Sequence, residues 1–218
     1  MISEEQWWST METYGAQIWP AQVFFYVIAV LLIGWLLLRP GRTHSLFTKL
    51  YLAIAFAWNG IVFFLFLAKD ITGTSYGSYF FGFLFILVSA LFVVDLFRKK
   101  MLFSFPNAAW RKYVTLGLIL LVFCYPLFGI AFGRSNFSLI TPGTFPCPTT
   151  ALGLLMLTTS LPRVDKIAYI LLLFWAVPFP PFLQLPKYGV YEDTIMFVSG
   201  IYSLILLLRY WKVKDKYG

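Results

Sequence analysis

The sequence predicts an all-α, polytopic membrane protein with seven transmembrane helices, the N-terminus outside and the C-terminus inside. Of its 218 residues, 60% are hydrophobic and only 12% are charged, whereas a soluble domain carries about 25% charged residues. Seven apolar segments of roughly 20 residues use most of the chain, which leaves room for one membrane domain only. The segments cover residues 20–38, 50–68, 79–97, 113–133, 148–162, 167–185 and 194–211.

The distribution of basic residues predicts the orientation. Threading the segments through a bilayer places three of the 17 basic residues, Lys69, Arg134 and Lys187, on one side. Short loops rich in Lys and Arg stay in the cytoplasm during insertion, so the side with the other 14 is expected to be inside. Because the net charge of +8 comes from these loops, we expect contacts with anionic lipids and no nucleic-acid partner. The 14 are Arg39, Arg42, Lys49, Arg98, Lys99, Lys100, Arg111, Lys112, Arg163, Lys166, Arg209, Lys212, Lys214 and Lys216.

The N-terminal region is expected to lie outside the membrane core. Residues 1–19 lack the basic and apolar regions of a cleavable signal peptide. Their three Glu and three Trp residues predict an amphipathic segment in the interface, because indole rings favour the headgroup level. The first span then opens on Trp19–Gln22.

In the second span, Asn59 is expected either to bond a neighbouring helix or to line a substrate path.

The third and fourth spans each carry one informative feature. Asp95, near the inner end of the third span, is expected to pair locally with Arg98 or Lys99. The Tyr125-Pro126 pair predicts a kink in the fourth span, because proline removes a backbone donor and clashes with the preceding turn. The loop over residues 133–148 is rich in Gly, Ser, Asn and Pro, which predicts an ordered turn folded back over the outer side.

The fifth and sixth spans are irregular. The fifth, from Pro148 to Leu161, is only about 21 Å long if helical, shorter than the roughly 30 Å hydrocarbon core. The sixth meets Pro178, Pro180 and Pro181, where the helix must end or kink. Irregular backbone at membrane depth is tolerated only when it is buried in protein or lines a watery cavity. We therefore expect a vestibule open to the outside, floored by the starts of the fifth and seventh helices.

The start of the fifth span, Pro146–Thr150, is the candidate binding motif. Free N–H groups of a first helical turn can hold an anion or a carbonyl, and the two Thr hydroxyls could add donors. Plain capping of the helix by the preceding loop is the alternative. The two cysteines, Cys124 and Cys147, are expected to be free thiols, since about 13 Å separates them along the bilayer normal.

The seventh span and the missing residue types narrow the function. Glu192 and Asp193 are expected to complement the dipole of the seventh helix, or else to form a cation-attracting mouth. This span has no lysine for a retinal Schiff base, and His44 is the only histidine. A haem held by two histidines, a several-histidine zinc site and a Ser-His-Asp set are therefore excluded. We expect no enzyme activity, no cofactor and no metal.

Two motifs together resemble those of a known family. The sequences WPAQ (19–22) and PCPTT (146–150) are similar to the starts of the first and fifth spans in an uncharacterised bacterial family of small seven-span membrane proteins. The resemblance covers nearly the whole chain and implies a place in the bacterial inner (plasma) membrane. It implies no activity, only that these two helix starts matter. The Pro-rich stretch 177–182 departs from the regular helix expected in the sixth span.

The sequence favours a small transporter or channel-like carrier with an outward-facing vestibule. The alternatives are an accessory subunit or assembly factor of a larger membrane complex, and a seven-helix sensor without retinal. Expected partners are membrane lipids, a small polar or anionic ligand, and a larger complex or a homo-oligomer. The pocket is expected between the first and fifth helix starts and the broken sixth helix. Its predicted lining is Gln22, Asn59, Tyr125, Cys147, Thr149, Thr150 and Trp175.

Overall fold

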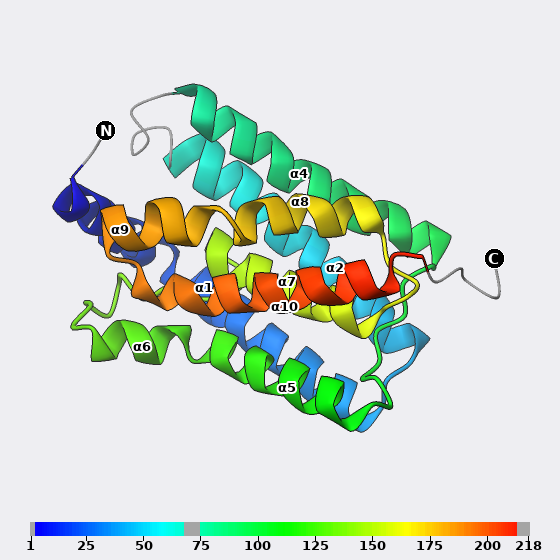
Figure 1. Ribbon diagram of the computed structural model, residues 1–218. Helices are drawn as coiled ribbons and strands as arrows, with labels where there is room; N and C mark the ends of the chain where they lie inside the picture. The colour runs from blue at the N-terminus through cyan, green and yellow to red at the C-terminus, as the bar shows by residue number, and fades with distance from the viewer. Residues whose placement is uncertain (1–2, 68–74, 213–218) are drawn as a thin grey trace.

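The computed structural model describes residues 3–67 and 75–212, and its regular elements are all helical (Figure 1). Lys69, Lys214 and Lys216, which enter the predicted charge sorting, lie outside the described residues. The elements are α1 (Glu4–Leu38), α2 (Arg42–Trp58), η1 (Asn59–Leu67), α4 (Ser75–Arg98), α5 (Ala109–Phe123), α6 (Tyr125–Ala131), α7 (Pro146–Thr159), α8 (Lys166–Ala176), η2 (Pro180–Gln184), α9 (Leu185–Tyr188), η3 (Tyr191–Asp193) and α10 (Thr194–Tyr210).

The helices run side by side along one bundle axis. Figure 1 shows the start of α1, α9 and the start of α10 at one end of the bundle, called the N-end here. The connections α1–α2, α4–α5 and α7–α8 and the end of α10 lie at the opposite end, called the C-end. Consecutive long helices therefore alternate in direction, which brings the basic connections of the sequence to one end.

Helix length and hydropathy make this a multi-pass membrane protein. Five helical stretches are long and apolar enough to cross a membrane, and the bent pair α5–α6 makes a sixth. With 14 residues, α7 is too short to count by this measure, so the predicted number of seven spans is not reached. Outward-facing side chains are apolar: Phe24, Leu31 and Phe83 expose 64%, 66% and 67% of their surface, as expected for side chains facing lipid. The five stretches are Glu4–Leu38, Arg42–Leu67, Tyr76–Arg98, Lys166–Tyr188 and Tyr191–Tyr210.

The first helix differs from the prediction, because it begins at Glu4 and continues through Pro20. Ser3 and Gln6 form a capping box that satisfies two backbone N–H groups at its start. Met11 and Tyr14 are buried against the bundle, whereas most residues of 4–19 are exposed or half-buried, so one face of this segment packs on the bundle and its place at the membrane interface stays a prediction. Pro20 has no N–H group, so α1 lacks one backbone hydrogen bond at this position. The packing of the preceding turns against the bundle offsets this loss.

The predicted breaks in the fourth and sixth spans are confirmed. The helix is bent by 52° between α5 and α6, with Pro126 in the first turn after the bend. In the sixth span α8 ends at Ala176, and the chain then passes through η2 into α9. Pro180 and Pro181 open η2, where missing N–H groups interrupt the regular hydrogen bonding.

The short helix α7 forms the centre of the bundle and contacts α2, α5, α8 and α10. All its residues except Cys147 are buried. A Cβ on Gly153 would lie 2.8 Å from the Phe56 ring of α2, so the absence of a side chain there lets the two helices approach closely. The loop before α7 also enters the bundle, because Ile140, Thr144 and Phe145 are buried.

The predicted local ion pair of Asp95 is wrong. Its carboxylate instead pairs with Lys49 of α2, with 2.7 Å between Nζ and Oδ2. It also accepts hydrogen bonds from the N–H groups of Lys100 and Met101, 3.2 Å and 3.0 Å away. The chain turns back at Lys99, which has a φ of +54°. This turn brings the following backbone over the carboxylate and leaves Lys49 as its cationic partner.

Candidate functional site

A cavity of about 100 Å³ lies near the N-end, between the start of α7, the broken sixth span and the start of α10. Cys147 of α7, Trp175 of α8, Gln184 of η2 and Asp193 of η3 all line it. The cavity has room for about three water molecules or one small organic group. The sequence predicts the pocket between the first and fifth helix starts and the broken sixth helix. The structure keeps the last two and has the start of α10 in place of residues 19–22.

Asp193 is the unusual residue of this cavity. Its side chain is 0% exposed, and among the described residues neither carboxylate oxygen accepts a hydrogen bond of normal length. It forms no ion pair within residues 3–67 and 75–212. Burying a charged carboxylate without a cation or hydrogen bonds costs several kcal/mol, so such a group binds either a proton or a cation. A cation that enters the cavity would remove this cost.

Two weak proton donors face the same carboxylate. The Cys147 thiol and the Tyr125 hydroxyl interact with Asp193 from beyond normal hydrogen-bond length. The Tyr125 oxygen accepts a hydrogen bond from the Met196 N–H at 3.1 Å, which leaves its own proton for Asp193. The Cys147 sulfur accepts one from Gln184 Nε2 at 3.6 Å. Both groups therefore complement the carboxylate without neutralising it.

Aromatic rings make most of the remaining wall. Trp175 stacks on Phe179 with 4.6 Å between ring centroids, and Phe81 and Phe64 meet it edge-on at 4.9 Å and 5.4 Å. The negative face of an aromatic ring attracts a cation, and the attraction grows when both are removed from water. The wall and the carboxylate thus favour the same charge of ligand.

The start of α1 covers the cavity from the N-end. Trp7 and Met11 line the cavity, and the Trp7 ring stacks on Tyr188 of α9 with 4.4 Å between centroids. Trp8 donates from Nε1 to the Tyr188 carbonyl at 2.9 Å. Arg134 lies 3.5 Å above the Trp8 ring. These contacts hold the first turns of α1 across the site.

A set of hydrogen bonds, called the Asn59 clip here, fixes the loop that carries Cys147. Asn59 donates from Nδ2 to the Gly143 carbonyl at 2.9 Å. The Thr149 hydroxyl accepts from the Gly143 N–H at 2.7 Å and donates to the Phe145 carbonyl. Asn59 and Thr149 are both 0% exposed, so these bonds form away from water. The clip joins α2, the loop and α7 and sets the position of the first turn of α7.

We expect Thr149→Val to lower the free energy of unfolding by about 1–3 kcal/mol, because it leaves the buried Gly143 N–H without its acceptor. Thr150→Val is the matched control, since the buried Thr150 hydroxyl has no hydrogen-bond partner among the described residues. That change should be neutral or stabilising. Chemical unfolding of both variants in detergent measures the difference, and equal effects would remove the clip from the account.

The structure brings together only part of the predicted site. Cys147 and Trp175 line the cavity, and Tyr125 reaches it through Asp193. Asn59 and Thr149 belong to the clip, and Thr150 is buried outside the cavity lining. Gln22 lies apart, where its amide donates to the Leu139 carbonyl at 3.5 Å and lines a separate hollow beside α6.

The first turn of α7 is a poor anion site. Pro146 and Pro148 have no N–H, and the Thr149 N–H donates to the Phe145 carbonyl at 3.3 Å. Only the Cys147 N–H is left over, and the Asp193 carboxylate beside it repels anions. The dipole argument from the sequence overlooked that two of the first three residues are prolines.

Sequence reasoning missed Gln184 and Trp7 and left Asp193 with two open interpretations. Both interpretations stay open, because Asp193 is the N-cap residue of α10 and an acidic group at a helix start complements the dipole even without a side-chain capping hydrogen bond. Gln184 follows the Pro-rich break directly, so a polar residue at that point was the available signal. Trp7 had no such signal, because its place depends on the packing of α1 against α9.

The Cys124 and Cys147 thiols are free, as predicted. Within the described ranges no group of three or more His, Cys, Asp or Glu residues could hold a metal ion. The cavity lining around Asp193 is mostly aromatic and aliphatic, with Cys147 and Gln184 as its other polar side chains. This donor set suits an organic cation better than a metal.

A family model described as a family of unknown function (DUF6064) matches residues 4–215. The chain belongs to this family. No curated protein and no solved structure matches it. The match confirms the resemblance to an uncharacterised family, while the bacterial origin stays a prediction. Since the DUF6064 family carries no known activity, the function has to be argued from the cavity.

Proposed function

We propose that this DUF6064 protein is a small membrane carrier that binds a small organic cation, a protonated or quaternary amine, in the N-end cavity. The observation that carries the proposal is the fully buried Asp193 carboxylate, which has neither a hydrogen bond of normal length nor an ion pair among the described residues. An intramembrane acid in a cavity is by default a functional group. Aromatic rings around it supply the remaining attraction for an alkylated ammonium.

The proposed ligand differs in charge from the polar or anionic ligand that the sequence suggests. An anion would meet the Asp193 carboxylate without a compensating basic side chain in the cavity lining. Gln184 adds a second acceptor, since its Oε1 has no hydrogen-bond partner among the described residues. Two acceptors and several ring faces together favour an ammonium with few N–H groups.

We further propose that the chain makes seven passes, with the N-end outside and the C-end in the cytoplasm of a plasma membrane. Support comes from α7, whose 14 residues lie at the bundle centre and run from the N-end toward the C-end, as α1 and α10 do (Figure 1). The cavity and the irregular backbone of the sixth span make a short central helix acceptable. The basic connections at the C-end support the orientation through the positive-inside rule.

Uptake of tetramethylammonium into proteoliposomes tests the carrier function. This cation does not cross bilayers unaided and carries no proton to lose. We expect the wild-type chain to accelerate uptake and Asp193→Asn to abolish the acceleration. Cysteines introduced at Glu5 and Lys216 report the orientation, and an impermeant thiol reagent on intact cells should label only the first. Saturable binding without uptake would instead favour the sensor or accessory-subunit alternatives. The absence of both binding and uptake would refute the proposal.

A further inference from the structure

A second hollow lies at the C-end, far along the bundle from the cavity. Its volume is about 440 Å³. The start of α2, the end of α4 and the connection between α7 and α8 surround it. Its lining has four basic residues and no acidic one, together with Thr43 and leucines at positions 46, 96 and 102. The four basic residues are Arg42, Lys49, Lys99 and Arg163.

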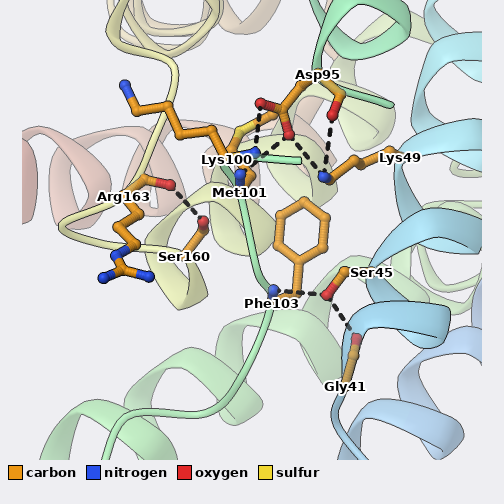
Figure 2. A network of polar contacts seen from close by, with 9 residues as sticks. All are labelled: Gly41, Ser45, Lys49, Asp95, Lys100, Met101, Phe103, Ser160 and Arg163. Carbon is orange, nitrogen blue, oxygen red and sulfur yellow. Dashed lines mark hydrogen bonds and ion pairs between the residues drawn. The ribbon is translucent and has the colours of Figure 1, made fainter. Parts of the chain in front are cut away.

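The walls of this hollow are fixed by a polar network (Figure 2). Asp95 holds Lys49 and the backbone N–H groups of Lys100 and Met101 at the end of α4. The Phe103 N–H donates to Ser45 Oγ at 3.0 Å, which ties the next stretch to the first turn of α2. On the other side, the Ser160 hydroxyl donates to the Arg163 carbonyl at 2.8 Å. The basic side chains therefore extend from anchored backbone.

The charge of the hollow is strongly positive. Asp95 neutralises Lys49, and both side chains are only 4% exposed. Arg42 and Lys99 add two positive charges to the lining that no ion pair within residues 3–67 and 75–212 neutralises. The start of α2 adds to them, because its N-cap is Gly41 and makes no side-chain hydrogen bond to the first turn. Unbonded first-turn N–H groups and the helix dipole favour an anion at this position.

The hollow is also partly apolar, which restricts the kind of anion. Leu46, Leu96 and Leu102 form the rest of its wall. Outside it, Phe47 and Phe97 expose 46% and 81% of their surface. A ligand with a phosphate group and an apolar portion would match both parts, with the phosphate against Arg42 and Lys99.

We propose that this C-end hollow is a binding site for a phosphate-bearing anion. Phosphate oxygens accept hydrogen bonds from guanidinium and ammonium groups together, and arginine binds them through two parallel N–H bonds. Two sources carry this chemistry, an anionic phospholipid and a soluble phosphate ester. The site is independent of Asp193 and of the proposed carrier function.

Native mass spectrometry of the purified full-length chain in detergent tests the site. The probes are dioctanoyl-phosphatidylglycerol, dioctanoyl-phosphatidylcholine, glycerol 3-phosphate and inorganic phosphate. We expect phosphatidylglycerol to bind in preference to phosphatidylcholine. The double variant Arg42→Gln/Lys99→Asn should weaken phosphatidylglycerol binding about 30-fold. Each basic residue near an anionic lipid contributes about 1 kcal/mol, which is a factor of about five in affinity. Asparagine tolerates the left-handed conformation at position 99, where φ is +54°, so the turn is retained.

Lys112→Gln is the matched control, because it removes one basic charge from an exposed position in the first turn of α5, outside the hollow. It should leave phosphatidylglycerol binding unchanged. If glycerol 3-phosphate or inorganic phosphate binds with the same dependence on Arg42 and Lys99, the natural ligand is a soluble phosphate ester. If only phosphatidylglycerol binds in this way, the natural ligand is a membrane phospholipid. Equal binding of both lipids with no binding of the soluble phosphates would overturn the proposal, as would an equal loss in the Lys112→Gln control.

Discussion

Asp193→Asn is expected to raise the free energy of unfolding of the ligand-free protein by about 1–3 kcal/mol. The wild-type carboxylate is fully buried and, among the described residues, has no ion pair and no hydrogen bond of normal length. Asparagine keeps its shape and removes the charge. A substitution that stabilises the protein and abolishes ligand binding indicates a residue retained for function rather than for folding. Thermal unfolding in detergent, without added cations, measures the effect.

Glu192→Gln is the matched control for this prediction. Glu192 is 3% exposed and is the neighbour of Asp193 in η3. Its Oε1 lies 4.0 Å from Arg134 Nε, so Glu192 has the cationic partner that Asp193 lacks. The same change from acid to amide should therefore lower stability at position 192 and raise it at position 193. Lower stability in both variants would contradict the unpaired state of Asp193.

Gly143→Ala is expected to lower the free energy of unfolding by about 2–5 kcal/mol, the sum of a backbone and a packing cost. Gly143 has a φ of +101°, a conformation that residues with a Cβ avoid. An added Cβ would also lie 2.5 Å from the Phe25 Cβ. Because the Asn59 clip holds Gly143 from both sides, the loop cannot move away without breaking buried hydrogen bonds.

Gly133→Ala separates the two causes. Gly133 has a φ of +75°, but nothing lies within 4 Å of the Cβ that alanine would add. This variant should lose only the backbone part, about 1–2 kcal/mol. Urea titration of both variants in the same detergent gives the comparison. A loss at position 143 no larger than that at position 133 would mean that contact with Phe25 does not constrain the loop.

The fold was predictable where it follows from composition and proline chemistry. Apolar runs located most helices, and Pro126 and Pro180 located the two breaks, because both signals act locally. The start of α1 was not predictable in this way. Residues 4–19 are polar enough for an interface, and only their contacts with α9 and the buried loop make them part of the bundle.

The site was predictable only in outline. The short fifth span and the broken sixth span correctly indicated where a cavity forms. The distribution of roles within it depends on long-range hydrogen bonds that no local pattern contains. Asn59 and Gly143 are 84 positions apart in the chain, and Cys147 and Gln184 are 37 positions apart. The sequence therefore placed Asn59 and Thr149 in the right region of the protein. It did not predict that they hydrogen-bond the loop around Gly143 instead of lining the cavity.

The central claim is that the N-end cavity binds an organic cation through Asp193. Equilibrium titration of the purified chain with tetramethylammonium, followed by tryptophan fluorescence, tests it most directly because Trp7 and Trp175 line the cavity. The neutral analogue tert-butanol serves as the probe of shape alone. We expect saturable binding of the cation to the wild-type chain. Binding of tert-butanol to the wild-type chain, and binding of the cation to Asp193→Asn, should each be at least about 30-fold weaker. Equal affinity for the cation and the alcohol, or undiminished cation binding in Asp193→Asn, would contradict the claim.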